Sequence, residues 1–462
     1  MTDYLADGGN GAVPLTLVTK AEFGTWLGGQ PSAVQAWVEA SGFSGSSNSL
    51  IRIPDGDGRL ARVVAGIDEN AEPWSYGDLP AKLGVGLYEI DGDLDTVRAT
   101  HAAIGWGLGT YAFSRYRRQN GQQDRKLATL VWPKSADRDL ARRTIEAVSL
   151  VRDLVNTPAI DLGPEELAEA VRQVGRRHRA RVTVTVGEEL LAADYPAIYM
   201  VGRASDREPR LIDLRWGKSG DPKVTLVGKG VCFDTGGLDI KPSAGMLTMK
   251  KDMGGAANML GLASMIMDAR LPVRLRLLIP AVENSISGSS IRPLDVIKTR
   301  KGITVEVGNT DAEGRIILCD ALAEADSEQP DLLLDAATLT GAARVALGPD
   351  LPALFSNDDT LAADLLRHAG AEHDPVWRLP LYPGYRKMLD SDVADINNVS
   401  SGGFAGAITA ALYLQTFVSP GTKWAHVDMF AWNQANRPGR PRGGEAQFIR
   451  GAFAMLQERY GR

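Results

Sequence analysis

The chain has 462 residues, and its 51 Lys and Arg against 57 Asp and Glu give a formal net charge of −6. Without a basic excess to neutralise a phosphate backbone, binding of nucleic acid along the whole chain is disfavoured. Two cysteines in a chain of this length exclude a disulfide framework and a CxxC motif, and they suit a reducing compartment.

The first residues lack the basic and apolar regions of a signal peptide. No segment reaches the roughly 18 uninterrupted apolar residues of a membrane span. We therefore expect a cytoplasmic protein that does not interact with membranes.

The first third of the chain predicts a small α/β domain. Leu60–Ile67 and Val85–Ile90 are apolar runs separated by Gly, Pro and Asp, a pattern typical of strands. Thr96–Arg115 carries apolar residues at helical spacing. We assign this domain to residues 1–135 and find no chemical motif in it.

An amphipathic helix is predicted to connect this domain to the rest of the chain, over residues 136–158. Apolar residues from Ile145 to Val155 recur there at steps of three and four. Pro158 ends the helix because proline disfavours helical geometry in the residue before it.

Residues 159–462 predict a larger α/β domain. Short apolar strands alternate with helices, which favours βαβ units and a central mixed, mainly parallel sheet. The expected strands are Val224–Val227, Val273–Val282, Ile303–Val307 and Asp331–Asp335, and the expected helices are Gly255–Ala269 and Gly314–Ala325. Ligands of such a sheet bind beyond the carboxyl ends of its strands.

Several well-known motifs are absent from this domain. Phe233 stands where a dinucleotide-binding fingerprint needs its third glycine, and Ile212 stands where a P-loop needs its first. The sequence has no GxSxG and no HExxH, and its five histidines are scattered. Any metal bound here would therefore need oxygen ligands.

Two charged segments follow predicted strands. Thr225–Gly255 leads from an apolar strand into a glycine-rich run of lysines and aspartates, and Asn309–Arg315 places two carboxylates and an arginine before a helix. Helix caps and solvated turns use the same residue types. Together, however, the segments supply three aspartates and a glutamate without a histidine, which suits divalent cations such as Mn or Zn. Carboxylates can bridge two cations about 3.5–4 Å apart, the geometry of two-metal hydrolysis.

These segments resemble the leucyl (cytosol) aminopeptidase family. NTDAEGR at Asn309–Arg315 matches the family signature, and VGKGVCFDTGG, KKDMGGAA, VENSISG and DAATLTGA surround it. The resemblance covers about Arg142 to the C-terminus. It implies a metal-dependent aminopeptidase that releases leucine and other apolar N-terminal residues from peptides, assembled as a homohexamer of two trimers.

The resemblance also implies the roles of individual residues. Two divalent metal ions per subunit, Mn or Zn, would be held by Lys229, Asp234, Asp252, Asp311 and Glu313. Lys241 would stabilise the oxyanion, and Arg315 would hold a bicarbonate ion that shuttles a proton. Lys229 can be a ligand only when neutral, so the neighbouring cations must depress its pKa. The residues implied to contact substrate are Met249, Asn309, Thr338 and Gly341.

Two positions depart from the family pattern, since the family often has Asn where Ile160 stands and Gly where Leu294 stands. Trp424, His426 and Trp432 are expected to pack the C-terminal core. Two other functions stay open. One is a dipeptidase of narrow specificity, for example for Cys-Gly. The other is an architectural DNA-binding role, for which an assembled hexamer would have to align basic residues such as Arg437, Arg440 and Arg442.

Overall fold

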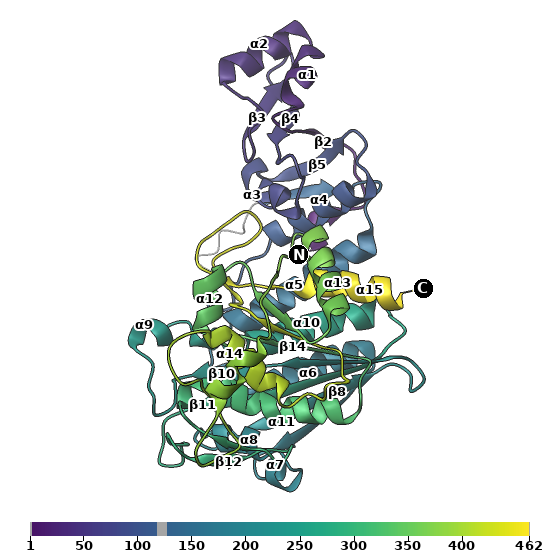
Figure 1. Cartoon of the computed structure of the whole chain (residues 1–462). Coiled ribbons are helices and arrows are strands. Elements are labelled where there is room, and N and C mark those ends of the chain that lie inside the picture. The colour runs from purple at the N-terminus through teal and green to yellow at the C-terminus, as the bar shows by residue number, and fades with distance from the viewer. Residues whose placement is uncertain (1, 118–126, 462) are drawn as a thin grey trace. The chain divides into compact units, whose positions relative to one another are not determined.

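The computed structural model describes residues 2–117 and 127–461. The chain divides into two compact units, one formed by Met1–Ser149 with Gln434–Arg442 and the other by Leu150–Asn433 with Gly443–Arg462 (Figure 1). The boundary at Ser149 falls inside helix α5 (Arg138–Asn156). Among the described residues, no helix combines the length and apolar character that crossing a membrane requires.

The first unit is built on a six-stranded sheet in the order β1-β6-β5-β2-β4-β3. Its strands are β1 (Leu5–Ala6), β2 (Val13–Val18), β3 (Leu50–Pro54), β4 (Leu60–Gly66), β5 (Gly86–Asp91) and β6 (Ala128–Val131). Its helices are α1 (Phe23–Gly28), α2 (Ser32–Ser41), α3 (Leu79–Leu83) and α4 (Thr96–Gly109), with 3₁₀ turns η1 (Thr2–Tyr4) and η2 (Pro73–Tyr76). Only β3 pairs antiparallel with its neighbour, so this unit is the predicted small α/β domain.

Helix α4 is shorter than its apolar pattern predicted, ending at Gly109 instead of Arg115. Glycine is a poor helix former, and Gly105, Gly107 and Gly109 stand together in the last turns of α4. A Cβ on Gly105 would lie 1.8 Å from the carbonyl oxygen of Pro73 in η2. These glycines therefore let α4 pack closely against η2, and they also favour an early end of the helix.

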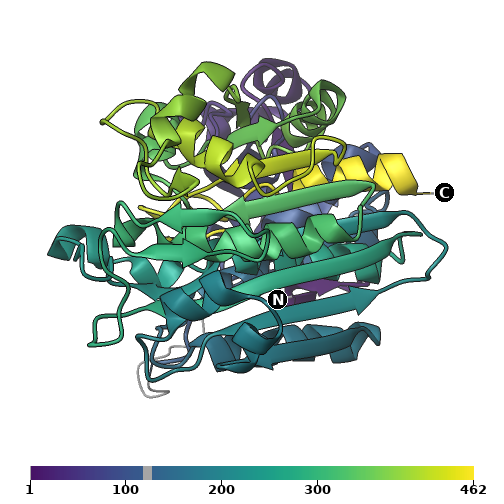
Figure 2. The ribbon, with the colours of Figure 1, turned by 60° about the horizontal axis from the view of Figure 1, so that its bottom comes forward.

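The second unit has a nine-stranded mixed sheet in the order β16-β15-β18-β14-β9-β11-β8-β7, with β10 also pairing with β11. Figure 2 shows strands of this sheet side by side. Its strands are β7 (Arg181–Val186), β8 (Arg210–Trp216), β9 (Lys223–Gly228), β10 (Gly230–Asp234), β11 (Arg274–Asn284), β14 (Leu332–Ala337), β15 (Ala353–Ser356), β16 (Trp377–Arg378) and β18 (Trp424–Asp428). The central strands β18, β14, β9, β11 and β10 run parallel, and β7, β8 and β15 supply the antiparallel pairings. The predicted fold class, a larger α/β domain with a mixed, mainly parallel sheet, is confirmed.

Helices and two small sheets complete this unit. The helices are α6 (Pro164–His178), α7 (Glu189–Ala192), α8 (Pro196–Gly202), α9 (Ser243–Met246), α10 (Gly254–Asp268), α11 (Glu313–Ser327), α12 (Gly341–Leu347), α13 (Asp359–Ala371), α14 (Gly406–Gln415) and α15 (Ile449–Tyr460), with 3₁₀ turns η4 (Met249–Lys251), η5 (Thr310–Ala312) and η6 (Pro383–Leu389). The small sheets are formed by β12 (Val296–Lys298), β13 (Thr304–Glu306) and β17 (Ile396–Asn397), and by β19 (Trp432–Asn433) with β20 (Gly443–Gly444). The predicted helices at α10 and α11 are confirmed.

The strand expected at Ile303–Val307 forms as β13, but it pairs with β12 and β17 and not within the central sheet.

Two glycines let helix α10 pack closely against the central sheet. A Cβ on Gly228 would lie 2.5 Å from the Cα of Ala256, and one on Gly255 would lie 2.1 Å from the carbonyl oxygen of Ala336. The first turn of α10 therefore sits directly on the ends of β9 and β14, beside the charged segments.

Candidate metal centre

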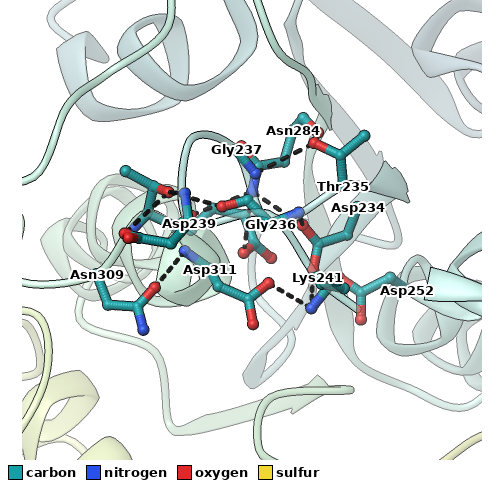
Figure 3. Close-up of polar contacts among 12 residues, drawn as sticks. Asp234, Thr235, Gly236, Gly237, Asp239, Lys241, Asp252, Asn284, Asn309 and Asp311 are labelled. Carbon is teal, nitrogen blue, oxygen red and sulfur yellow. Dashed lines mark hydrogen bonds and ion pairs between the residues drawn. The ribbon is translucent and has the colours of Figure 1, made fainter. Parts of the chain in front are cut away.

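The charged residues of both segments meet beyond the carboxyl ends of the central strands (Figure 3). Lys229 lies between β9 and β10, and Asp234 is the last residue of β10. Asp252 follows η4 directly, Asp311 lies in η5, and Glu313 begins α11. The turn before α11 is fixed by Asn309, whose side-chain oxygen accepts a hydrogen bond of 2.7 Å from the backbone N–H of Asp311.

Three carboxylates form the centre of this cluster. Asp234, Asp252 and Glu313 each offer an oxygen, and these oxygens all lie within 4.8 Å of one another. The three residues are only 1–2% exposed. Burial of so many negative charges is costly unless cations compensate them.

Two lysines supply positive charge at the cluster. The Lys229 Nζ lies 2.7 Å from Asp252 Oδ2 and 3.0 Å from Glu313 Oε1. The Lys241 Nζ lies 2.7 Å from Asp234 Oδ2 and also pairs with the carboxylate of Asp311. Burial acts to lower the pKa of each lysine, but the surrounding carboxylates outweigh it and raise both pKa values above the ordinary lysine value. With protein groups alone, both side chains are therefore ammonium ions.

The carboxylates respond in different directions to the same surroundings. Burial, followed by the charge of Asp234, raises the pKa of Glu313 to about 8. Burial also raises the pKa of Asp311. Burial acts in the same direction on Asp252, but the charges of Lys229 and Lys251 bring its pKa below the ordinary value. The lysines alone therefore do not compensate the negative charge of all the carboxylates in the cluster.

The cluster fits divalent cations. Asp252 Oδ2, Asp311 Oδ1 and Glu313 Oε1 are buried oxygens whose partners among the described residues are the ammonium groups of Lys229 and Lys241. A carboxylate oxygen is an acceptor only, so an atom of this kind needs either an ammonium group or a metal ion beside it. Four carboxylates, together with the Lys229 nitrogen once bound cations have removed its proton, would form a donor set of the kind that hard or borderline divalent ions take.

Arg315 lies next to the cluster in the first turn of α11. Its Nη1 donates a hydrogen bond of 2.6 Å to the backbone oxygen of Asn398, and its Nε finds no acceptor among the described residues. The side chain is only 9% exposed, and burial lowers the pKa of its guanidinium group. Arg315 therefore has an N–H donor, on Nε, that no described residue uses.

A cavity of about 440 Å³ opens onto these residues. All four of the predicted substrate-contacting residues line it, namely Met249, Asn309, Thr338 and Gly341. Lys229, Asp234, Lys241, Asp252, Asp311 and Arg315 line it as well. Glu313, which is 1% exposed, is the one predicted site residue that is not part of this lining.

Comparison with known proteins identifies the family. Residues 149–451 match the catalytic domain of the cytosol aminopeptidase family, and residues 13–133 match the N-terminal domain of M17 aminopeptidases. The chain belongs to the cytosol aminopeptidase family. Its members are metal-dependent aminopeptidases that act on peptides, and this chain is a metallo-aminopeptidase of that family.

Relatives of the family cover nearly the whole chain. The crystal structure of a cytosol aminopeptidase from Coxiella burnetii is 49% identical, has a TM-score of 0.95, and covers 99% of this chain and 100% of its own. A probable cytosol aminopeptidase from Leifsonia xyli is 38% identical over 94% of this chain and 92% of its own length. The bottromycin maturation enzyme BotP in complex with Mn is 32% identical, with a TM-score of 0.85 over 97% of this chain and 99% of its own.

Three buried polar residues that the sequence analysis did not assign hold the site in place. The side chain of Asn284 contacts Asp234 and Glu313. Asn398 accepts hydrogen bonds from the backbone N–H groups of Gly308 and Asn309 through its side-chain oxygen. Asp428 accepts them from the backbone N–H groups of Leu339 and Thr340, just before α12. Only Asn284 lay inside a quoted motif, VENSISG.

The wall of the cavity also contains an aromatic residue between two cations. The Phe430 ring centroid lies 5.3 Å from the Lys251 Nζ and 4.6 Å from the Arg344 Cζ. All three residues line the cavity, and the sequence analysis assigned none of them to the site. Sequence alone gave no signal for this contact, because the three residues come from separate segments.

The aromatic residues expected in the C-terminal core behave differently from one another. Trp424 and His426 are fully buried. The indole N–H of Trp424 donates a hydrogen bond to the carboxylate of Asp335, and His426 Nδ1 pairs with the same carboxylate. Trp432 is only half-buried, and its ring lies 5.6 Å from the Lys250 Nζ. The expectation for Trp432 was therefore only partly met, because it lies in the short strand β19 outside the central sheet.

Proposed function

We propose that this aminopeptidase releases N-terminal residues from peptides with two divalent metal ions, and that it prefers leucine and other apolar residues. The observation that carries the proposal is the buried cluster of carboxylates and lysines at the wall of a cavity. A narrow dipeptidase activity and a DNA-binding role have no comparable observation in their favour.

The residues proposed to hold the ions divide into two overlapping sets. Asp234, Asp311 and Glu313 would hold one ion, and Lys229 and Asp252 would join the shared Asp234 and Glu313 around the other. We propose Mn or Zn for both positions, and the Mn complex of the similar enzyme BotP supports the first choice. When bound, such ions supply Lewis acidity and a water molecule whose pKa is lowered towards neutrality.

Lys241 is proposed to stabilise the negative charge that develops on the scissile carbonyl oxygen. Its ammonium group stands at the cavity wall beside Asp234 and Asp311, and these carboxylates keep it protonated. A fixed cation at this position needs no reorganisation as the charge develops.

Arg315 is proposed to bind bicarbonate, which would move the proton during the reaction. An arginine cannot itself act as a base near neutral pH, but its planar group binds an oxyanion through two hydrogen bonds. The Nε without a described acceptor and the position of Arg315 at the cavity support this role.

The cavity supports an exopeptidase with an apolar side-chain pocket. Asp252 is proposed to receive the free α-amine of the peptide. Met249, Leu351 and Phe430 give the wall apolar surface near Thr338 and Gly341, and the flexible methionine side chain adapts to varied apolar groups.

The domain organisation, assembly and location of the protein complete the proposal. We propose an N-terminal domain over residues 1–135, a connecting helix over 136–158 and the catalytic domain over 159–462. We also propose that six copies assemble as two trimers in the cytoplasm. Light scattering after size-exclusion chromatography measures the assembly, and a mass of fewer than six 49.6 kDa chains would contradict it.

The function is tested by hydrolysis of leucine p-nitroanilide after chelation and after addition of Mn or Zn. We expect chelation to abolish activity, added metal to restore it, and N-acetyl-leucine p-nitroanilide to be inert. A matched Glu313→Ala variant should lose activity while keeping the circular dichroism of the parent. Activity that survives complete chelation, or equal activity on the acetylated substrate, would contradict the proposal.

A further inference from the structure

Asn284 ends strand β11 at the centre of the candidate metal site. Strand β11 pairs in parallel with β10, and Asn284 lies opposite Asp234 in this register. Asn284 is 2% exposed. An amide in such a position must satisfy its donors within the protein, because water does not reach it.

The side-chain amide of Asn284 faces three acceptor oxygens. Its Nδ2 donates a hydrogen bond of 2.8 Å to Asp234 Oδ1 and one of 3.1 Å to the backbone oxygen of Thr310, and it lies 3.4 Å from Glu313 Oε2. An amide NH₂ group has two protons, so the longest of these contacts is a shared one. The donor thus spans the two carboxylates that belong to both proposed ion sets.

The backbone holds this amide in one orientation. The carbonyl oxygen of Asn284 accepts hydrogen bonds from the backbone N–H and the hydroxyl of Thr235, at 3.1 and 2.8 Å. Gly237 has a φ of +64° and leaves room for the side chain, since a Cβ there would lie 3.0 Å from Asn284 Oδ1. The backbone of Asn284 is therefore held beside Thr235, and its side chain has room beside Gly237.

The contacts distinguish the two oxygens of each carboxylate. Asp234 Oδ1 also accepts a hydrogen bond of 2.8 Å from the backbone N–H of Gly236, so it is fully engaged. Asp234 Oδ2 instead faces the ammonium group of Lys241, and Glu313 Oε1 faces that of Lys229 without accepting a hydrogen bond. One oxygen of each carboxylate thus contacts Asn284, and the other oxygen faces a lysine ammonium group.

We propose that Asn284 is a positioning residue for the metal centre. Its amide holds Asp234 and Glu313 so that their free oxygens face the ions, and this raises the affinity of the site for divalent cations. The proposal rests on the proposed two-metal function. Groups that orient metal ligands in this way typically contribute about 10- to 100-fold to metal affinity.

The test is the binding of Mn²⁺ to full-length protein from which metal has been removed, measured by isothermal titration calorimetry. Asn284→Ala removes the amide, and we expect it to raise the dissociation constant for Mn²⁺ at least about tenfold. Asn284→Ser keeps a polar side chain but is too short to reach both carboxylates, and it provides the same test if the alanine variant does not fold.

A second buried asparagine gives a matched control. Asn258 in α10 is fully buried, donates to the backbone oxygen of Gly254 and accepts from the backbone N–H of Gln447, and does not contact the carboxylates. Asn258→Ala should lower the thermal midpoint while the folded protein keeps the parental Mn²⁺ affinity.

The outcomes separate this inference from the function on which it rests. If the parent binds Mn²⁺ and the Asn284 variants bind it within about twofold of the parent, Asn284 has only a structural role and the inference is wrong. If the parent itself binds no divalent ion, the proposed two-metal function fails first. Weakened binding in the Asn284 variants, with unchanged binding in Asn258→Ala, supports the inference.

Discussion

The proposed role of Lys241 can be tested separately from metal binding. Replacing its ammonium group in Lys241→Met removes one stabiliser of the oxyanion, and we expect kcat to fall by about 10²–10³ with the Mn content unchanged. Steady-state kinetics and metal analysis of the same sample measure both effects.

Lys250 provides the control, because its Nζ donates to the backbone oxygen of Asn156 and it does not line the cavity. Lys250→Met should keep kcat within about twofold of the parent. Loss of bound Mn from Lys241→Met would show that its role has been assigned wrongly.

Leu294 departs from the family pattern at a position whose backbone conformation favours glycine. The family often has glycine at this position, and the structure places Leu294 at φ +70° with 69% of its surface exposed. A left-handed conformation costs a residue with a Cβ about 1–2 kcal/mol. We therefore expect Leu294→Gly to raise the free energy of unfolding by about 1 kcal/mol, as measured by urea denaturation.

Another exposed leucine tests whether this gain depends on backbone conformation. Leu247 is 80% exposed but has a φ of −50°, so glycine there relieves no strain. Leu247→Gly should leave stability unchanged or lower it by a few tenths of a kcal/mol to about 1 kcal/mol. A gain in both variants would contradict the argument from φ.

At the scale of elements, the first turn of helix α11 connects fold and chemistry. Gly314 follows Glu313 in this turn, and a Cβ on it would lie 2.5 Å from Cε and 2.7 Å from Nζ of Lys229. Gly314→Ala adds helix propensity worth up to about 1 kcal/mol but must displace the Lys229 ammonium group. We expect at least a tenfold loss of kcat/KM with little loss of stability.

The equivalent change elsewhere in the same unit checks this reasoning. Gly370 lies in α13, where an added Cβ meets no atom within 4 Å. Gly370→Ala should leave kcat/KM unchanged and match or exceed the parent in thermal midpoint. If Gly314→Ala retains full activity, Lys229 does not need its present position.

Sequence patterns predicted the elements whose signals are local. The apolar run of β14 and the helix after the NTDAEGR motif are written in consecutive residues, and both formed where expected. The pairing of β13 outside the central sheet was not predictable, because it depends on β17, which lies far along the chain. The same holds for Asn398 and Asp428, whose contacts with the site join residues more than 80 positions apart.

The site residues were predictable for a different reason. Lys229, Asp234, Asp252, Asp311 and Glu313 stand in two charged segments, and their individual roles were predicted from the resemblance to the family. Lys229 and Asp234 lie at the ends of central strands, whereas Asp311 and Glu313 follow β13, outside the central sheet, and reach the site through η5 and the start of α11. The orientation of each carboxylate is set instead by Asn284 and by backbone N–H groups, which composition and spacing do not encode.

At the scale of the whole molecule, the chain returns from the second unit to complete the first. Gln434–Arg442 belongs to the unit formed by Met1–Ser149. Within this unit, a Cβ on Gly77 would lie 2.3 Å from the backbone nitrogen of Gly439. The sequence analysis considered this stretch only as a source of basic residues for DNA binding, because its partners are more than 300 positions away in the chain.

The division into two units also predicts how metal acts on stability. All of the proposed ligands lie in the second unit, and a ligand that binds only the folded state stabilises it by about 2.7 kcal/mol at 100 times its dissociation constant. We expect Mn²⁺ added to chelated protein to slow amide hydrogen exchange in β9, β10 and α11 and to leave β2, β4 and β5 unchanged. Asp252→Asn, which removes the charge of one ligand, should lose most of this protection. Equal protection of both units, or protection that persists fully in Asp252→Asn, would show that the ions stabilise the protein from another site.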